Sequence, residues 1–282
     1  MVKIFLICLF VFSFSIAEET QKIDKKELLI QKIKSLIDPA VFVKDKAYID
    51  IIFSQKDDYF TKKGLVDSVK VIQTLKENGI LKLFFKKPKE INISFKTEGR
   101  PLFFVKIMSD SLRNIGYYRY VTEESNLKDS KFTWKINLTS EYAADPLVLS
   151  IELNKSGCKI VDIIRDSATD WTYIIDMKEA RLNTRVLQDG EEIKLKRSLY
   201  SYWLDVSKIK KLKISSSYRN NWYPYIAYYD KSLNLLRVIK RDTKRRRMTL
   251  NMKENTQYLK ISDIYTLKNI KDALILTPEG ER

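Results

Sequence analysis

The chemistry open to this chain is limited by the residue types that it lacks. No histidine occurs in its 282 residues, which excludes an imidazole base, a Ser-His-Asp triad and histidine metal ligands. Two cysteines are too few for a cysteine-rich zinc site or a disulfide framework. Paired carboxylates, which glycosidases use, occur at Asp57-Asp58, Glu123-Glu124 and Glu191-Glu192. Neighbours in sequence usually point apart, so we interpret these pairs as ordinary surface and predict no catalytic residue.

Four aspartates could offer oxygen ligands to a hard cation. They lie along a strand–turn–strand segment and are Asp162, Asp166, Asp170 and Asp176. They lack the Asp-x-Asp-x-Asp-Gly loop of calcium sites, and no glycine-rich phosphate loop occurs in the sequence. We therefore predict solvated turn residues, no metal, no cofactor and no enzymatic activity. A glycosidase or calcium-dependent enzyme is kept as the third hypothesis.

A basic cluster at residues 240–247 is the sharpest feature of the sequence. Its six cations are Lys240, Arg241, Lys244, Arg245, Arg246 and Arg247. A second, lysine-rich run at 208–213 is expected to cover one face of a sheet. Such clusters suit anionic glycan, lipopolysaccharide, nucleic-acid phosphate or an acidic protein. The alternative is a charged hairpin tip that keeps a sheet edge soluble and unpaired. We predict the six cations to be partner- or anion-binding residues.

Aromatic side chains lie close to the basic cluster in sequence. Trp222, Tyr223 and Tyr225 stand in a stretch that also contains Arg219. Aromatic rings beside arginine can stack on bases or sugars, so these three residues are candidate stacking residues. The alternative is that they belong to the core.

The N-terminus has the features of a secretory signal peptide. Lys3 precedes an apolar run at 4–16, and Ser15-Ile16-Ala17 supplies small residues for cleavage. The run is shorter than the roughly 20 residues that cross a bilayer. We predict cleavage after Ala17, a periplasmic location in a Gram-negative bacterium and no transmembrane helix afterwards. This predicted export argues against nucleic acid as a partner.

Two further residues follow from this predicted export. Cys158 is the one cysteine left after cleavage, and its apolar neighbours predict a buried thiol. Asn92 lies in Glu90-Ile-Asn-Ile-Ser94, which fits the acceptor pattern of a bacterial N-glycosylation system. Asn92 is therefore a candidate glycosylation site.

Two halves of the chain differ in charge and in aromatic type. Residues 1–179 carry 29 basic and 25 acidic side chains, whereas 180–282 carry 23 and 11. All 13 phenylalanines lie at or before Phe132. These shifts predict a signal peptide at 1–17, a helical segment at 18–40, an α/β domain at 41–179 and a basic β-sandwich domain at 180–282.

The elements of the α/β domain are predicted from periodicity and from helix-end residues. Helices are expected at 24–37, 65–78, 101–115 and 146–156, with proline at two starts and glycine after three ends. Strands are expected at 47–53, 80–85, 91–95, 117–121, 132–138, 159–164 and 171–175. This alternation predicts helices packed on a mixed sheet.

Short strands with turn signals dominate the second half. They are expected at 184–187, 193–196, 200–206, 212–216, 224–229, 233–240, 248–252 and 257–261, with a hairpin turn at Asp189-Gly190 and another turn at 230–234. This spacing predicts a β-sandwich. The segments 222–230, 233–238 and 257–261 resemble jelly-roll accessory domains of secreted bacterial proteins.

A family resemblance rests on the first half. The helix end Ser109-Asp-Ser-Leu-Arg-Asn-Ile-Gly-Tyr-Tyr-Arg-Tyr120, Trp134 and the strand pair at 159–176 resemble the N-terminal α/β domain of periplasmic TolB proteins. With the predicted export and the acceptor pattern at Asn92, the chain resembles FlgQ-type flagellar basal-disk proteins. That resemblance implies a structural part near the outer membrane, assembled with a disk-forming lipoprotein.

The sequence supports two main hypotheses on function. The first is a non-enzymatic structural or scaffold protein of a cell-envelope machine, such as the flagellar motor disk, which acts through contacts with other envelope proteins. The second is a binding module for cell-wall or surface polysaccharide, lipopolysaccharide or another anionic envelope polymer.

Overall fold

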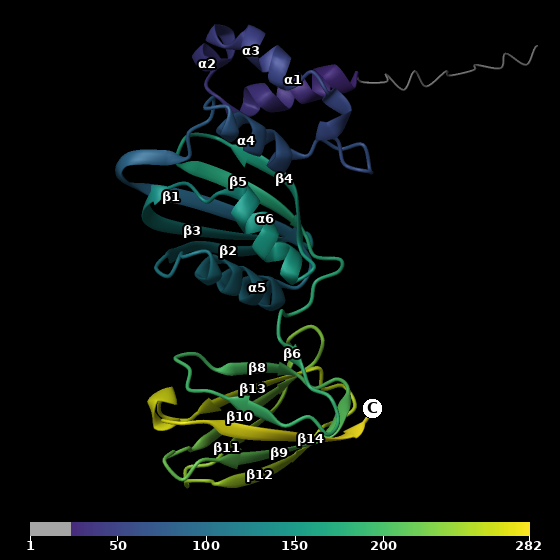
Figure 1. Ribbon diagram of the computed structural model, residues 1–282, viewed down its shortest axis with the longest axis vertical. Coiled ribbons are helices and arrows are strands. Elements are labelled where there is room, and N and C mark those ends of the chain that lie inside the picture. Colours follow the sequence, from purple (N-terminus) through teal and green to yellow (C-terminus); the bar gives the residue numbers. More distant parts are fainter. Residues whose placement is uncertain (1–23) are drawn as a thin grey trace, which may run out of the picture.

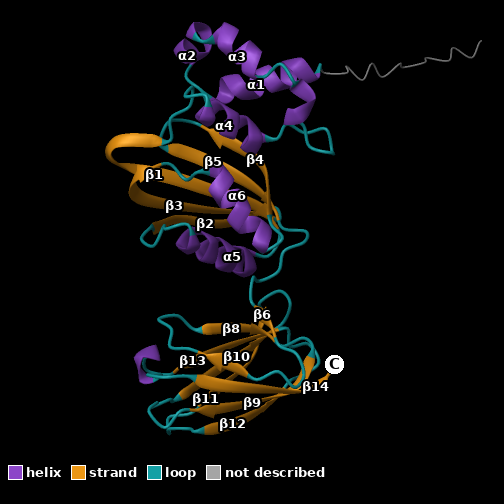
Figure 2. Ribbon diagram, in the orientation of Figure 1, coloured by secondary structure: helices purple, strands orange, loops and turns teal. Residues whose placement is uncertain are grey.

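The chain folds into a mixed α/β structure. The computed structural model describes residues 24–282, so the predicted signal peptide lies outside the described residues. Six α-helices and three sheets occur within this part. The helices gather in an N-terminal region, and strands and loops make up most of a C-terminal region (Figures 1 and 2). The expected combination of helices and sheets is confirmed.

The N-terminal region is a five-stranded sheet with helices. Its helices are α1 (Lys25–Leu36), α2 (Pro39–Lys44), α3 (Lys46–Ile52), α4 (Ser68–Glu77), α5 (Pro101–Asn114) and α6 (Pro146–Lys155). Its strands are β1 (Phe84–Glu98), β2 (Val121–Lys128), β3 (Lys131–Tyr142), β4 (Lys159–Arg165) and β5 (Asp170–Asp176). The strand order is β2-β3-β1-β5-β4, with β1 and β5 parallel. The sheet is therefore mixed, as expected.

The alternation of residues along β1 explains which face the helices cover. Ile91, Ile93 and Phe95 are fully buried, whereas Asn92 and Ser94 between them are only half-buried. Because successive side chains point to opposite faces, one face is apolar and the other is polar. Helices α5 and α6 lie against one face of the sheet (Figure 1).

Helix α1 docks on this body rather than standing free. Leu29, Ile33 and Leu36 are buried at helical spacing. Lys32 on the same helix donates to the Asp162 carboxylate on the edge strand β4. These contacts place the helix on the body of the N-terminal region. No helix among residues 24–282 is long and apolar enough to cross a membrane.

Three strand predictions in this region are wrong. Residues 47–53 form most of α3 instead, because Ile49 and Phe53 are buried at a spacing of four. Of the strand expected at 80–85, only Phe84 and Phe85 are strand, and they open β1, whose pairing shifts between Phe84 and Lys89. The strand expected at 91–95 lies within β1 and is confirmed. Residues 117–120 are not strand, and β2 begins at Val121. Strand β2 was missed because all its residues are exposed.

The C-terminal region consists of two sheets around one core. The first has the order β11-β10-β13-β8-β6, and the second has the order β12-β9-β14-β7. Their strands are β6 (Arg185–Val186), β7 (Ile193–Leu195), β8 (Tyr202–Asp205), β9 (Ile209–Ser216), β10 (Pro224–Tyr229), β11 (Leu235–Lys240), β12 (Arg247–Asn251), β13 (Tyr258–Asp263) and β14 (Leu274–Glu281). Buried side chains from both sheets form a single cluster. Strand β14 was not predicted.

Of the two turns predicted in this region, one is confirmed as predicted and the other is not a hairpin. Asp230 accepts backbone hydrogen bonds from Ser232 and Asn234 in the β10–β11 turn, as the sequence predicts. Gly190 also lies in a turn, with φ +72°. However, β6 and β7 on either side of it belong to different sheets, so the expected hairpin at Asp189-Gly190 is wrong.

The two regions are joined by direct contacts. Arg100 at the start of α5 donates to the Ser232 hydroxyl over 3.2 Å. The Tyr258 hydroxyl accepts from the backbone N–H of Leu182 over 3.3 Å. Leu233 and Tyr258 are buried in the N-terminal core, while the second core begins at Leu187. The C-terminal region therefore contributes side chains to both cores.

Gly157 provides a test of the helix end that leads into β4. It ends α6 with φ +70°, and an added Cβ would lie 2.1 Å from the Glu179 carbonyl oxygen. We expect Gly157→Ala to lower the free energy of unfolding by about 2–4 kcal/mol, from left-handed backbone strain and overpacking together. Gly190→Ala is the control, because its φ is similar but the space is open. Urea denaturation checks the difference, and equal losses would contradict it.

Candidate functional site

The basic cluster forms a crossover loop and not a hairpin tip. Lys240 ends β11, Arg247 begins β12, and these strands belong to different sheets. All residues from 240 to 247 are exposed. The loop is held by its backbone, since Arg245 N–H donates to the Trp222 carbonyl over 3.0 Å and the Arg246 carbonyl accepts from Ser216 N–H over 2.7 Å. The backbone that carries these cations is therefore held in place by hydrogen bonds.

The positive charge of the six cations is not neutralised by acidic side chains of the described chain that pair with them. Within residues 24–282 none of them forms an ion pair, and Asp242 is the one acidic residue in the run. The second basic run differs, because Lys211 and Lys213 on β9 both approach Glu279 on β14. Leu212 and Ile214 alternate with these lysines and are buried. The expected cover of one sheet face is confirmed for this run.

Strand β11 is a free sheet edge beside the loop. It pairs with β10 on one side, and no other strand of the described chain pairs with it. Leu235 is 56% exposed and Leu236 is 39% exposed. An edge strand of this kind leaves backbone donors and acceptors available for another strand. The edge and the loop together form one surface, which we call the basic edge (residues 235–247).

The three candidate stacking residues lie in different environments in the structure. Trp222 is fully buried, and its indole N–H donates to the Ser262 carbonyl over 2.9 Å. The Tyr223 ring lies edge-on to Tyr265. Tyr225 is half-buried, with the Lys240 ammonium 5.5 Å from its ring centroid. Trp222 belongs to the core, so the prediction of a three-residue platform is wrong.

Asn92 is held inside the sheet. It lies on the central strand β1, and its amide nitrogen donates to the Asp170 carboxylate over 2.8 Å. Its oxygen accepts from the Asn137 amide over 3.0 Å. Glycan attachment at this nitrogen requires these bonds to break in the middle of a paired strand. The folded chain therefore does not present Asn92 as a glycosylation acceptor.

The acidic residues considered for metal binding are dispersed. Asp162 binds Lys32 and Ser68, whereas Asp170 binds Asn92 and Ser167. Hydrogen bonds from Ser167 and Asn92 hold the pKa of Asp170 below its usual value. In the part of the chain that is described, no group of three or more Cys, Asp or Glu side chains could hold a metal ion.

Cys158 is buried, as its sequence context predicts. It is fully inaccessible and has no disulfide partner. Burial raises the pKa of its thiol to about 11, and the nearby Asp176 carboxylate adds to the effect. A thiol with such a pKa is almost entirely protonated at neutral pH, so it behaves as a packing residue.

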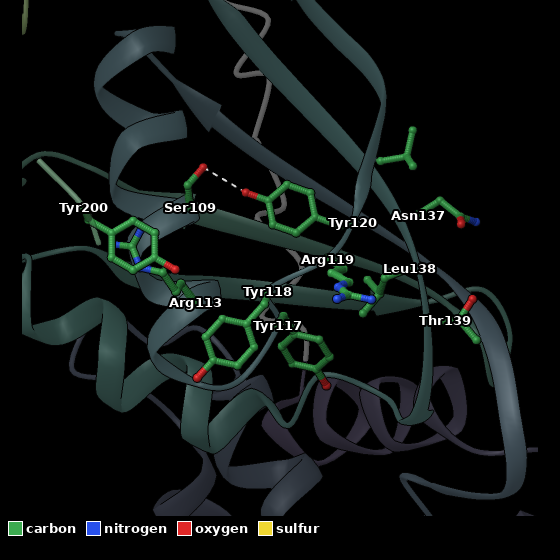
Figure 3. A pocket seen from close by; sticks show the side chains of 11 residues that line it. Ser109, Arg113, Tyr117, Tyr118, Arg119, Tyr120, Asn137, Leu138, Thr139 and Tyr200 are labelled. Atoms are coloured by element: carbon green, nitrogen blue, oxygen red, sulfur yellow. Dashed lines mark hydrogen bonds between the residues drawn. The ribbon is translucent and has the colours of Figure 1, made fainter. Parts of the chain in front are cut away.

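A hollow that the sequence had not indicated lies where the two regions meet. Its volume is about 680 Å³. Four tyrosines and two arginines dominate its lining, and Figure 3 shows them: Tyr117, Tyr118, Tyr120, Tyr200, Arg113 and Arg119. All but Tyr200 come from the end of α5 and the segment that follows it. Tyr200 comes from the loop between β7 and β8 of the C-terminal region.

A helix end and a strand end together produce this hollow. Gly116 has φ +101° and follows α5, and Tyr117 N–H donates back to the Leu112 carbonyl over 2.9 Å. This cap redirects the chain away from the helix axis. Strand β2 then starts opposite Asn137, although β3 continues to Tyr142. The end of β3 is consequently left unpaired by β2 and lines the hollow.

Two of the four tyrosines that line the hollow are held in place by hydrogen bonds. The Tyr120 hydroxyl donates to Ser109 over 3.1 Å (Figure 3). The Tyr120 ring also packs edge-on against Trp134. The Tyr117 hydroxyl donates to the Tyr142 carbonyl over 3.3 Å. Burial raises the pKa of Tyr117, so this hydroxyl stays protonated near neutral pH. These contacts hold the side chains of Tyr117 and Tyr120 in position before a ligand binds.

The two arginines of the hollow differ in their surroundings. The Arg113 guanidinium pairs with Asp110 over 2.6 Å and lies 4.4 Å from the Tyr200 ring centroid. Arg119 is exposed and forms no ion pair with any residue from 24 to 282. The hollow therefore offers one compensated and one uncompensated guanidinium. The run Tyr117-Tyr118-Arg119-Tyr120 supplies most of this lining, but by itself it does not indicate a hollow.

Comparison with known proteins does not assign this chain to a family. No protein-family model and no curated protein matches it. Among solved structures, the secreted serine protease VesC from Vibrio cholerae is similar at 11% identity, with a TM-score of 0.18. The match covers 70% of this chain and 48% of that protein, so the chain spans about half of its length. A likeness at this TM-score carries no argument about fold or activity.

Proposed function

We propose that the protein is a non-enzymatic scaffold protein of the bacterial cell envelope that acts through contacts with other proteins. The observation that carries the proposal is the basic edge, where a free β-strand runs into six uncompensated cations. The C-terminal region that presents it is proposed to be a jelly-roll-like β-sandwich, supported by the single core between its two sheets. The periplasmic location and the flagellar disk stay predictions from the sequence.

An extended, acidic segment of a partner protein suits this surface. Its backbone would pair with the free edge of β11, since edge strands accept an added strand through main-chain hydrogen bonds. Its carboxylates would meet the arginines of the loop, and such charge complementarity raises association rates and selects the partner. Leu235 and Leu236 would gain an apolar contact at the same time.

Site-specific crosslinking tests this proposal. A photo-reactive residue at Leu235, in the envelope of the cells that make the protein, is expected to crosslink to an acidic, extended segment of one envelope protein. Mass spectrometry of the crosslinked peptides identifies that segment. Leu65 is the matched control, because it is 51% exposed but lies outside the basic edge. Identical crosslinks at both positions, or none at Leu235, would overturn the proposal.

A further inference from the structure

The hollow between the two regions has a chemical character that the proposed scaffold role does not use. Its lining is aromatic and hydroxyl-rich, with Leu138 and Val121 as its aliphatic members. We propose that it is a binding site for a saccharide that carries a carboxylate. This site is separate from the basic edge, and the proposal does not depend on the proposed scaffold function.

Aromatic walls suit the two kinds of surface on a sugar ring. A pyranose presents C–H groups on its faces and hydroxyls around its rim. Tyrosine rings offer flat apolar surfaces with a polar end, and they lose little conformational freedom on binding. Tyr117 and Tyr120 are already fixed by hydrogen bonds. These two side chains therefore lose little conformational entropy when a ligand binds.

Polar groups for the sugar hydroxyls surround these rings. Asn137 and Thr139 line the hollow. The Asn137 amide nitrogen already donates to Asn92, which leaves its oxygen as an acceptor. Strand β3 runs past the start of β2, so backbone groups near Thr139 are also unpaired by that neighbour. This mixture of apolar faces and a few directed polar groups is typical of small-molecule sites.

The charge of the hollow favours a single negative charge on the ligand. Asp110 accepts from both Lys106 and Arg113, so Arg113 is largely compensated and mainly positions Tyr200. Arg119 is the uncompensated cation at the rim. A guanidinium matches a carboxylate with two parallel hydrogen bonds. One free guanidinium corresponds to one carboxylate better than to a doubly charged phosphate.

The size and position of the hollow fit a short oligosaccharide. Its volume of about 680 Å³ lies within the roughly 300–1,000 Å³ of typical small-molecule pockets. Tyr200 belongs to the C-terminal region, and the other aromatic residues belong to the N-terminal region. A bound saccharide would therefore contact both regions and strengthen the junction already formed by Arg113 and Tyr200.

A saccharide array followed by calorimetry tests the assignment. The full chain after residue 17 is applied to an array of carboxylated, phosphorylated, sulfated and neutral saccharides. We expect binding to carboxylated members, and at least tenfold weaker binding when the same carboxylate is methyl-esterified. Arg119→Gln is expected to remove that preference, and Tyr118→Ala is expected to weaken binding of both forms. Both side chains are exposed, so these variants are expected to fold.

A charge-matched control separates the site from general electrostatics. Arg241→Gln removes an exposed arginine from the basic edge, and it should leave saccharide binding unchanged. Failure to bind any carboxylated saccharide would overturn the proposal. Equal binding of acid and ester, a preference for phosphorylated or sulfated members, or equal effects of Arg119→Gln and Arg241→Gln would do the same. None of these results bears on the crosslinking at Leu235, so failures of the two proposals are distinguishable.

Discussion

Trp222→Ala will lower the free energy of unfolding by about 3–5 kcal/mol, the cost of truncating a large buried aromatic side chain. Trp222 is fully inaccessible and lies in the core that both C-terminal sheets share. The substitution also leaves the Ser262 carbonyl without the indole N–H that it accepts over 2.9 Å. Guanidinium denaturation of the two proteins, followed by circular dichroism, measures the difference.

The same experiment decides between a core and a ligand-binding role for this residue. Tyr223→Ala is the matched control, because Tyr223 is half-buried and packs on Tyr265 at the surface. We expect it to lose much less stability than Trp222→Ala. Loss of polysaccharide binding in Trp222→Ala at full stability would contradict the core assignment. Any binding loss with partial unfolding reports on the core, so Trp222→Ala alone does not test a sugar platform.

Local signals in the sequence were sufficient for several elements. Pro101 and Pro146 start α5 and α6, while Gly116 and Gly157 follow their ends, and the structure confirms both helices. A proline with fixed φ suits a first helical turn, and a glycine accepts the left-handed conformation after the last. These are properties of single residues, so no knowledge of the rest of the chain was needed.

Long-range packing decided the elements that were predicted wrongly. Residues 47–53 are rich in apolar residues, but burial of Ile49 and Phe53 on one side selects a helix. The turn at Asp189-Gly190 forms, yet the turn residues do not specify which sheet the next strand joins. The loop at 240–247 follows the same rule, because local sequence predicts a connection between strands and not their pairing.

The candidate sites show the same division. The basic cluster at 240–247 could be found in the sequence because its cations are adjacent there. The free edge of β11 beside it could not, because it depends on how the strands pair. The hollow could not, since Arg119, Leu138 and Tyr200 come together only when two regions pack. Burial of Trp222 but not of Tyr225 could not be predicted either. Trp222 precedes β10 and Tyr225 lies on it, so the packing of this segment against the rest of the region decides their burial, and local sequence does not determine that packing.

Reversing the charge of the loop will abolish most of the affinity of the basic edge for an acidic strand. We expect Arg245→Glu/Arg246→Glu/Arg247→Glu to weaken binding of a short synthetic peptide of alternating Val and Glu at least a hundredfold. That factor corresponds to about 2.8 kcal/mol, at about 1.4 kcal/mol per factor of ten. Calorimetry at low salt measures it. The fold is expected to persist, because the loop is anchored by backbone groups of Arg245 and Arg246 and not by their side chains.

A matched variant distinguishes this local effect from a change in total charge. Lys62→Glu/Lys63→Glu/Lys128→Glu alters the net charge equally at exposed positions of the N-terminal region. We expect this variant to weaken binding of the peptide much less than the charge reversal in the loop does. Raising the ionic strength from about 0.1 M to 1 M shortens the screening length from about 10 Å to about 3 Å, so most of the difference between the variants should disappear. Equal weakening by both variants would mean that net charge, and not the basic edge, attracts the acidic strand. A salt-independent difference would instead mean that the reversal had damaged the pairing edge of β11 itself.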